Sequence, residues 1–196
     1  MYYHVDRLAA LVAPAAVTAV PDGGYFYASD PSFTAWRATL LWIAGAMNSR
    51  GGLNAACVDG VARAGGDPLT CAFPEVVSPH LSTRTFVMNS RFDPALDAIA
   101  AGESGGNAAH VNEIGARVLG LSNTTLLLGG RGNGAFITSC HEHCGQWAQG
   151  VDGDFNVTID GASAVPALME WRRGGQRSLW VQPAAYPCND CCSGGN

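Results

Sequence analysis

Helix-like and strand-like segments alternate along the chain, and this alternation is the strongest constraint on its fold. Residues 83–89 and 135–138 carry the apolar and β-branched side chains typical of short buried strands. Segments with apolar residues at helical spacing lie before, between and after them. Because strands separated by helices usually pair in parallel, we expect an α/β fold with a mostly parallel sheet flanked by helices. In such folds the functional groups lie where strands end and loops begin.

The individual segments can be assigned from periodicity and from turn residues. Helices are expected at 5–12, 32–47, 111–121 and 166–173 and from 92 to 99, and strands at 16–20, 83–89, 124–128 and 135–138. Ser32 is suited to cap the second helix, and Asp93 before Pro94 to cap the third. With 196 residues the chain is long enough for one domain with a sizeable core.

Charge and hydropathy exclude some classes of partner. The formal net charge is −5 and all eleven basic residues are arginine, so no basic surface for nucleic acid is expected. Without lysine, the glycine-rich run 129–134 is a turn and not a phosphate-binding loop of the Walker type. The longest apolar run, around residues 40–47, is far shorter than the ~20 residues that span a bilayer. We therefore expect neither a nucleic-acid partner nor a membrane span.

Seven cysteines favour an oxidising compartment. Cys57 and Cys71 flank a glycine-rich loop that a disulfide could close. Because seven is odd, one cysteine has no partner within the chain. Either a thiol stays free, or its partner lies elsewhere.

Two cysteines and two histidines fall within the five positions Cys140 to Cys144. All four are zinc-ligand types, and Cys188, Cys191 and Cys192 could add to them. On an extended backbone, however, positions 141 and 143 point the same way while 140 and 144 do not all converge with them. The spacing also lacks the two separated knuckles of most structural zinc sites. The alternatives are a zinc site, a catalytic histidine held by cysteines, and a cross-linked loop.

Gly102 to Gly106 formally matches the G-x-S-x-G nucleophile elbow, with Ser104 as the nucleophile. An elbow serine follows a strand, whereas residues 94–101 have a helical pattern. Glu113, between Ser104 and His143, lies in mid-helix and is poorly placed as the acid of a triad. A glycine-rich surface loop accounts for the segment better.

Asp93 has two readings. As the residue before Pro94 it is a helix N-cap, which is the simpler role. An aspartate at the end of one strand and a histidine after a later strand also form the second half of a Ser-Asp-His hydrolase. Asp93 and His143, fifty residues apart, have that order.

Five stretches together resemble the pectin acetylesterase and Notum family. They are Pro21-Asp-Gly-Gly-Tyr-Phe26, Cys71-Ala-Phe-Pro74, Thr85-Phe-Val-Met-Asn-Ser-Arg-Phe-Asp93, Phe136-Ile-Thr-Ser-Cys-His-Glu-His-Cys144 and Tyr186-Pro-Cys-Asn-Asp-Cys191. The resemblance implies an α/β-hydrolase type esterase with a Ser-Asp-His triad that needs no metal or organic cofactor. It places the acid at Asp93 and the base at His143, three residues after Cys140, and it implies that bridged cysteines fix the histidine loop.

The resemblance also implies what this stretch of sequence leaves out. The family's nucleophile lies in a Ser-Ala-Gly-Gly turn just before a helix that resembles residues 3–8. We therefore expect residues 1–196 to be the C-terminal portion of a single α/β-hydrolase-like domain, disulfide-bearing and inactive by itself. The intact protein is expected to be secreted, in the extracellular space or cell wall, and to release acetate from an acetylated, pectin-like polysaccharide. The alternatives are a non-catalytic cysteine-rich binding module whose histidine cluster binds zinc, a Notum-like deacylase, and a hydrolase that uses Ser104.

Overall fold

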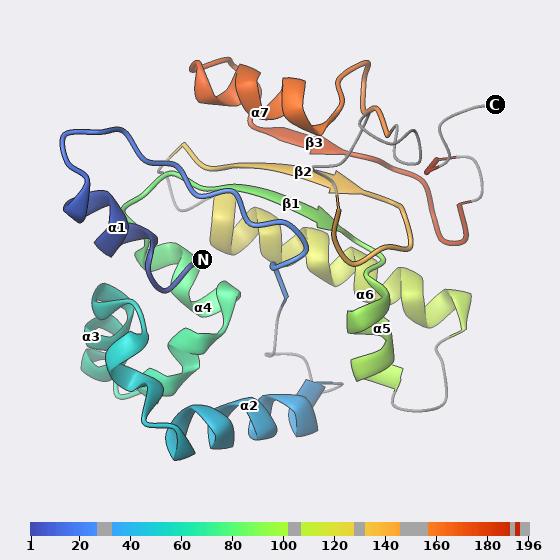
Figure 1. Ribbon diagram of the computed structural model, residues 1–196. Coiled ribbons are helices and arrows are strands. Elements are labelled where there is room, and N and C mark those ends of the chain that lie inside the picture. The colour runs from blue at the N-terminus through green and yellow to red at the C-terminus, as the bar shows by residue number, and fades with distance from the viewer. Residues whose placement is uncertain (27–32, 102–106, 128–131, 146–156, 189–190, 193–196) are drawn as a thin grey trace.

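A parallel sheet of three strands lies at the centre of the computed structural model, which describes residues 1–26, 33–101, 107–127, 132–145, 157–188 and 191–192 (Figure 1). The strands are β1 (Phe86–Ser90), β2 (Gly134–Thr138) and β3 (Leu179–Val181), in the order β1-β2-β3. Phe86 pairs with Gly134 and Ser90 with Thr138, so β1 and β2 run side by side over their whole length. The predicted α/β class with parallel strands is confirmed.

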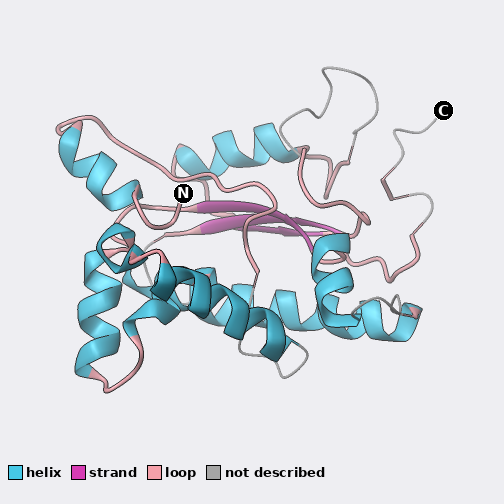
Figure 2. Cartoon of the chain, turned by 60° about the horizontal axis from the view of Figure 1, so that its bottom comes forward, coloured by secondary structure: helices cyan, strands magenta, loops and turns pink. Residues whose placement is uncertain are grey.

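Helices cover both faces of this sheet (Figures 1 and 2). The α-helices are α1 (Val5–Leu11), α2 (Thr34–Ala46), α3 (Ala55–Arg63), α4 (Pro74–Val77), α5 (Pro94–Ala101), α6 (Ala108–Leu121) and α7 (Ala164–Arg172). Shorter turns are η2 (Ser49–Gly52), η3 (Pro68–Ala72), η4 (Ser78–His80) and η6 (Ser122–Leu127). Helix α7 lies on one face of the sheet, and α3, α4 and α6 lie on the other.

The two faces of the strands contribute to two separate cores. Successive side chains of a strand point to opposite faces. Phe86, Phe136 and Trp180 therefore pack with Trp171 of α7. Val87, Ala135 and Ile137 join the other core, which includes residues of α1, α3 and α4. All residues of β1 and β2 are buried, as expected for parallel strands covered on both sides.

The strand predicted at 16–20 is present only as two isolated bridges to the outer edge of β1. Ala19 pairs with Thr85 and Asp22 with Met88, both in parallel. Between these bridges the ladder needs an N–H at position 21, and Pro21 has none. The carbonyl of Pro21 still accepts a hydrogen bond from Met88 N at 2.9 Å. The segment thus lies beside β1 as a fourth, interrupted strand.

The strand predicted at 124–128 is wrong over the residues described. Residues Ser122–Leu127 instead continue α6 as a turn of π-helix. The hydroxyl of Ser122 donates to the carbonyl of Val118 at 2.7 Å, and that of Thr124 donates to Gly120 at 3.0 Å. These hydroxyl groups tie the segment back to the helix, so the β-branched and leucine composition does not decide its conformation.

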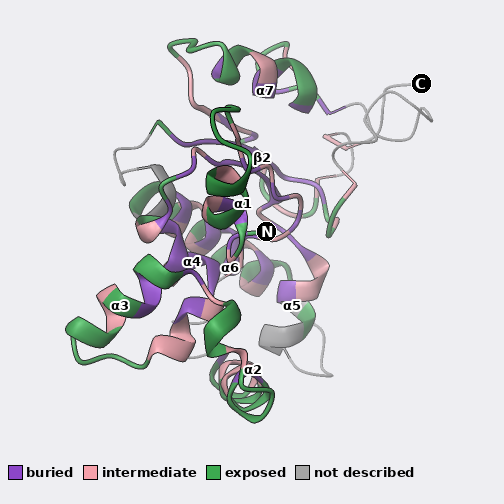
Figure 3. Ribbon diagram, turned by 60° about the vertical axis from the view of Figure 1, so that its left-hand side comes forward, coloured by how far each residue is buried: buried purple, intermediate pink, exposed green. Residues whose placement is uncertain are grey.

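Helix α2 is more exposed than its apolar composition suggests (Figure 3). Trp42 and Met47 are 72% and 73% exposed, whereas Phe33, just before the helix, is buried. The helix begins at Thr34, and Ser32, the predicted cap, lies outside the described residues. Among the helices that the structure describes, none has both the length and the apolar character needed to cross a bilayer.

Three disulfides connect the described cysteines. Cys57 is bonded to Cys71, as predicted from their spacing, and joins α3 to η3. Cys140 is bonded to Cys192, and Cys188 to Cys191. Cys144 is an exposed free thiol. Disulfides of this number are typical of proteins that fold in an oxidising compartment.

Candidate active site

Asp93 lies just beyond the C-terminal end of β1. The strand ends at Ser90, whose hydroxyl donates to the carbonyl of Cys140 and accepts from the N–H of Phe92. These two bonds fix the turn that follows the strand, and Asp93 lies at the start of α5 as a result. The Oδ1 atom of Asp93 accepts the N–H of Ala95 at 2.8 Å, so the predicted helix cap is formed.

His143 lies on the loop that follows β2. Ser139 anchors the start of this loop to Gln182, which accepts its N–H at 2.8 Å through Oε1 and its hydroxyl at 2.8 Å through the backbone carbonyl. The disulfide between Cys140 and Cys192 adds a covalent tie one residue later. The loop is therefore anchored where it leaves the sheet, and it carries His143 towards the C-terminal end of β1.

Asp93 and His143 meet side chain to side chain. The Nδ1 atom of His143 lies 2.8 Å from Oδ2 and 3.0 Å from Oδ1 of Asp93. The aspartate side chain is 3% exposed, whereas that of the histidine is 57% exposed. An ionised carboxylate only accepts hydrogen bonds, so Nδ1 carries the proton and Nε2 is left as the basic atom. The pair can therefore accept a proton from a group presented at its open side.

Burial is the main influence on the acid of the pair. It raises the pKa of Asp93, and the hydrogen bonds from His143 and from the N–H of Ala95 act against it. The partnership with His143 therefore offsets part of the cost of burying the carboxylate.

The turn 21–24 packs against the loop that carries His143 and fixes its position. In the turn 21–24, Gly23 has φ of +64°, and its Cα packs directly against the carbonyl of His143. A Cβ atom at Gly23 would lie 2.0 Å from that oxygen. The neighbouring carboxylate of Asp22 accepts the N–H of Gly145 at 3.0 Å. The turn and the loop therefore fit together only with glycine at position 23.

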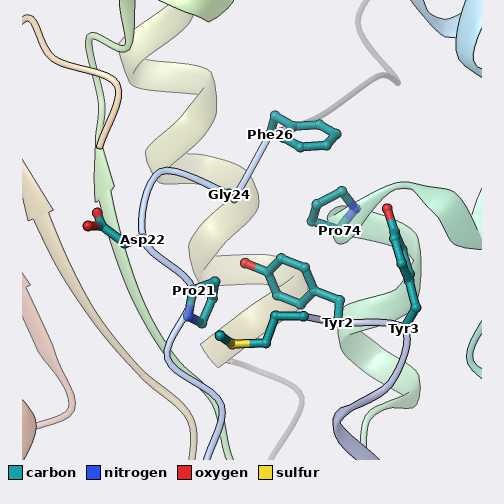
Figure 4. A pocket seen from close by; sticks show the side chains of 8 residues that line it. Tyr2, Tyr3, Pro21, Asp22, Gly24, Phe26 and Pro74 are labelled. Carbon is teal, nitrogen blue, oxygen red and sulfur yellow. The ribbon is translucent and has the colours of Figure 1, made fainter. Parts of the chain in front are cut away.

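A cavity of about 300 Å³ lies on the other side of this turn (Figure 4). It is lined by Met1, Tyr2, Tyr3, Pro21, Asp22, Gly24, Phe26 and Pro74. The carboxylate of Asp22 points away from the aromatic rings, towards the histidine loop. Asp22 thus lines this cavity and is also bonded to the loop that carries His143. The sequence singles out this Asp-Gly-Gly turn but assigns no role to its aspartate.

Two other members of the cluster at 140–144, Cys140 and His141, have partners elsewhere. The ring of His141 packs against Tyr186, with ring centroids 5.1 Å apart. Cys140 is held in a disulfide, so it is not available as a thiolate ligand. Over the described residues, no three His, Cys, Asp or Glu side chains are grouped so that they could hold a metal ion.

Glu142 is the residue of this loop that the sequence gives no reason to select. Its Oε1 atom accepts a hydrogen bond from the hydroxyl of Thr138 at 3.2 Å, and its Oε2 atom is buried. Burial, together with the nearby charges of Asp22 and Asp93, raises the pKa of Glu142 to about 7. A buried carboxyl with a strongly raised pKa, next in the sequence to His143, is typical of functional sites.

The alternative nucleophile, Ser104, lies outside the described residues, as does the rest of Gly102 to Gly106. The segment before it is the helix α5. A strand leads into a nucleophile elbow, so this context does not match the motif.

Comparison with known proteins agrees with the fold. The family model for Pectinacetylesterase matches residues 1–193. Two crystal forms of the Wnt deacylase Notum from Drosophila are similar in structure, with TM-scores of 0.72 and 0.69 at 20% and 22% sequence identity. Each match covers 97% of this chain but 55% and 54% of the Notum chains, so the chain spans just over half of their length. No curated protein matches the chain by sequence. The sheet and its helices correspond to the α/β-hydrolase fold, as predicted.

Proposed function

Because the chain belongs to the pectinacetylesterase family, we propose that it carries the acid and the base of a carboxylic-ester hydrolase. Asp93 is the acid and His143 the base of a Ser-Asp-His triad. The observation that carries this proposal is the contact of 2.8 Å between the buried carboxylate and the exposed imidazole. They lie at the ends of adjacent parallel strands, which is where sites of α/β folds are found.

The chemistry follows from the geometry of the pair. Asp93 fixes the tautomer and orientation of His143, so that Nε2 takes the proton of a serine hydroxyl as the oxygen attacks the ester carbonyl. The imidazolium then gives this proton to the leaving alcohol, and an acyl-enzyme remains. In the second half, His143 takes a proton from water, whose oxygen attacks the acyl carbon. Collapse of that intermediate releases acetate and returns the proton to the serine.

We place the serine and its oxyanion-binding groups in a part of the whole protein that precedes Met1. The family's Ser-Ala-Gly-Gly turn lies just before a helix that resembles residues 3–8. The arrangement around the turn 21–24 supports this placement. Met1 lines the same cavity as Asp22, and Asp22 accepts the N–H of Gly145 on the loop that carries His143.

The proposed substrate is an acetylated, pectin-like polysaccharide outside the cell. The family and the three disulfides support an extracellular location. The net charge of −5 provides no general attraction to an anionic polysaccharide, so recognition depends on local contacts. Notum, which has a similar fold, is named as a deacylase of Wnt, and the length of the acyl group is therefore a variable that the test must include.

The test measures ester hydrolysis by the whole protein, including the segment upstream of Met1. We expect acetate release from acetylated pectin and from an aryl acetate, with lower activity on aryl esters of long fatty acids. His143→Ala should reduce kcat/KM by ~10³-fold or more. His141→Ala is the matched control and should remain active. An active His143→Ala protein, or a wild type inactive on every ester, contradicts the proposal.

Two experiments on the 196-residue chain itself distinguish the proposed function from its alternatives. A fluorophosphonate probe should not label it, whereas covalent labelling of Ser104 would support a self-contained hydrolase. One tightly bound zinc per purified chain would support a metal-binding module instead.

A further inference from the structure

Asn123 is an exposed asparagine in η6, just after the end of α6. It begins the triplet Asn123-Thr-Thr, which has the N-x-Thr pattern of acceptors for N-linked glycans. Asn54 and Asn89 are buried and take part in hydrogen bonds. The side chain of Asn123, in contrast, has no hydrogen-bond partner within the described residues. Its amide nitrogen is therefore accessible and available for modification.

The local sequence suits an acceptor in the chain before it folds. N-linked glycans are added to the nascent chain, and the acceptor triplet is then extended. Serine, asparagine and threonine are weak helix formers. The helical turn of η6 is held by hydroxyl bonds from Ser122 and Thr124 back to carbonyls of α6. Until α6 has formed, these bonds are absent, and the segment keeps the extended conformation that its β-branched composition favours.

The fold places Asn123 at the edge of the sheet opposite to the acid–base pair. Both α6 and η6 lie between β1 and β2 in the chain, and a connection between parallel strands returns from the C-terminal end of the first to the N-terminal end of the second. Helix α6 runs back along the sheet in this way (Figure 1). Asp93 and His143 follow the C-terminal ends of the same strands. A glycan on Asn123 therefore leaves the exposed imidazole accessible.

We propose that Asn123 is the acceptor of an N-linked glycan. The donor is an oligosaccharide joined through its anomeric carbon to a lipid diphosphate. The Nδ2 atom of Asn123 forms a bond to that carbon while the bond from the carbon to the diphosphate oxygen breaks. The amide nitrogen loses one proton, and the lipid diphosphate leaves with the electron pair of the broken bond. The triplet Asn156-Val-Thr also fits the pattern, but Asn156 lies outside the described residues.

The disulfides agree with the compartment that this reaction needs. N-linked glycans are added in the lumen of the secretory pathway, where disulfides also form. The described part of the chain contains three disulfides. The inference rests on the proposed extracellular location and not on ester hydrolysis, so the two can fail separately.

The test translates the chain of 196 residues into endoplasmic-reticulum microsomes behind a cleavable signal peptide. Cleavage of the signal reports entry, and this readout does not depend on folding. All forms carry Asn156→Gln, so that the second triplet adds no glycan. We expect the signal-cleaved chain to show a discrete gel shift that is removed by an amidase specific for N-linked glycans. Signal-cleaved chain without this shift would overturn the proposal.

Four variants assign the shift to the triplet. Asn123→Gln removes the acceptor and Thr125→Ala removes the hydroxyl two residues later, so each should abolish the shift. Thr125→Ser keeps a hydroxyl and should retain it. Thr124→Ala is the matched control, because it loses a hydroxyl that bonds to α6 but stands at the position where any residue except proline is accepted. A shift that survives Asn123→Gln places the glycan elsewhere and rejects the proposal.

The position at the opposite edge is tested on the whole protein. After secretory expression, the peptide that contains Asn123 should carry the glycan in mass spectra. Its removal by the amidase should leave kcat/KM on an aryl acetate within about twofold, because the modification is remote from the pair. A change of ~10-fold or more would contradict the placement of the glycan away from the site. A glycosylated whole protein that is inactive on every ester would reject the esterase and retain the acceptor site.

Discussion

Asp93 holds His143 and the first turn of its own helix with one carboxylate. Its Oδ2 lies 2.8 Å from Nδ1 of the histidine, and its Oδ1 accepts the N–H of Ala95 at 2.8 Å. In the sequence, helix cap and triad acid are competing interpretations of this residue. In the structure the cap and the contact with His143 coexist, because a carboxylate has two oxygens and four lone-pair sites. The cap orients the carboxylate that orients the histidine.

Substitution of Asp93 should separate these two contacts. Asparagine is also a good N-cap, so Asp93→Asn should change the free energy of unfolding by less than ~0.5 kcal/mol. It cannot support the imidazolium and favours the wrong tautomer, so kcat of the whole protein should fall by ~10³- to 10⁴-fold. Asp93→Ala should lose both contacts and cost a further ~1 kcal/mol of stability. Urea unfolding and ester hydrolysis measure the two effects.

Asp67 offers a matched control for the cap. Its Oδ1 accepts the N–H of Leu69 at 2.9 Å at the start of η3, and it is exposed. Asp67→Ala should lower stability to an extent similar to the cap loss at Asp93 and leave kcat unchanged. If Asp67→Ala abolishes activity as well, the effect of Asp93→Ala is one of folding and not of catalysis.

The disulfide between Cys140 and Cys192 should matter to the site more than its contribution to stability suggests. It closes 52 residues and is attached three residues before His143. Replacing both cysteines with serine should cost about 2–4 kcal/mol of unfolding free energy. Because the histidine loop loses its covalent tie, kcat should also fall by ~10-fold or more.

The disulfide between Cys57 and Cys71 is the corresponding control. It closes 14 residues between α3 and η3, away from the histidine loop. Its double serine variant should be destabilised by a similar amount while kcat stays within about twofold of the wild type, at a temperature where both variants are folded. Equal losses of activity in the two double variants would argue that the tie at Cys140 has no special effect on His143.

The sequence predicts the elements whose residues decide their own conformation. Periodicity locates β1, β2, α6 and α7 to within a few residues, and the Asp-Pro pair marks the start of α5. The sequence pattern fails where one missing N–H or one side-chain hydrogen bond determines the conformation of the segment. Pro21 removes one N–H and reduces a strand to two bridges. Ser122 and Thr124 bond back to α6 and turn a strand-like composition into helix.

The residues of the candidate site also divide into those that the sequence predicts and those that only the structure reveals. Chain order and the family resemblance select Asp93 and His143, and the structure brings them together. The raised pKa of Glu142 depends on how its side chain is buried and on which charges lie nearby. Asp22 is 120 residues away from Glu142 in the sequence. No local pattern could reveal that the two carboxyl groups interact electrostatically.

The pH dependence of stability should include a contribution from Asp6 of α1. Partial burial acts to raise the pKa of Asp6, but hydrogen bonds from Ser82 and Thr83 outweigh it and lower the pKa below its usual 3.8. The folded state thus holds the proton less tightly than the unfolded chain. This stabilisation is present above pH 3.8 and is lost as the pH falls through the folded-state value. Acid unfolding followed by circular dichroism measures it.

Two variants isolate the contribution of Asp6. Asp6→Asn should be less stable than the wild type at neutral pH, and the difference should shrink as the pH falls below 4. Asp59→Asn, at an exposed position of α3, should follow the wild-type curve. If Asp6→Asn and wild type unfold in parallel down to the acid limit, the hydrogen bonds to Ser82 and Thr83 contribute nothing to the pH dependence.

Gly23 provides the sharpest test of how the histidine loop is held. Gly23 and Gly65 both have positive φ, +64° and +77°, so an alanine is strained at either position. At Gly65 nothing lies within 4 Å of the added Cβ, and Gly65→Ala should cost only ~1 kcal/mol. At Gly23 the Cβ would meet the carbonyl oxygen of His143 at 2.0 Å, so the turn and the loop must separate. Gly23→Ala should therefore cost an additional ~1–3 kcal/mol in urea unfolding and displace the ring of His143 from Asp93. Equal costs for the two variants would mean that the turn does not hold the loop.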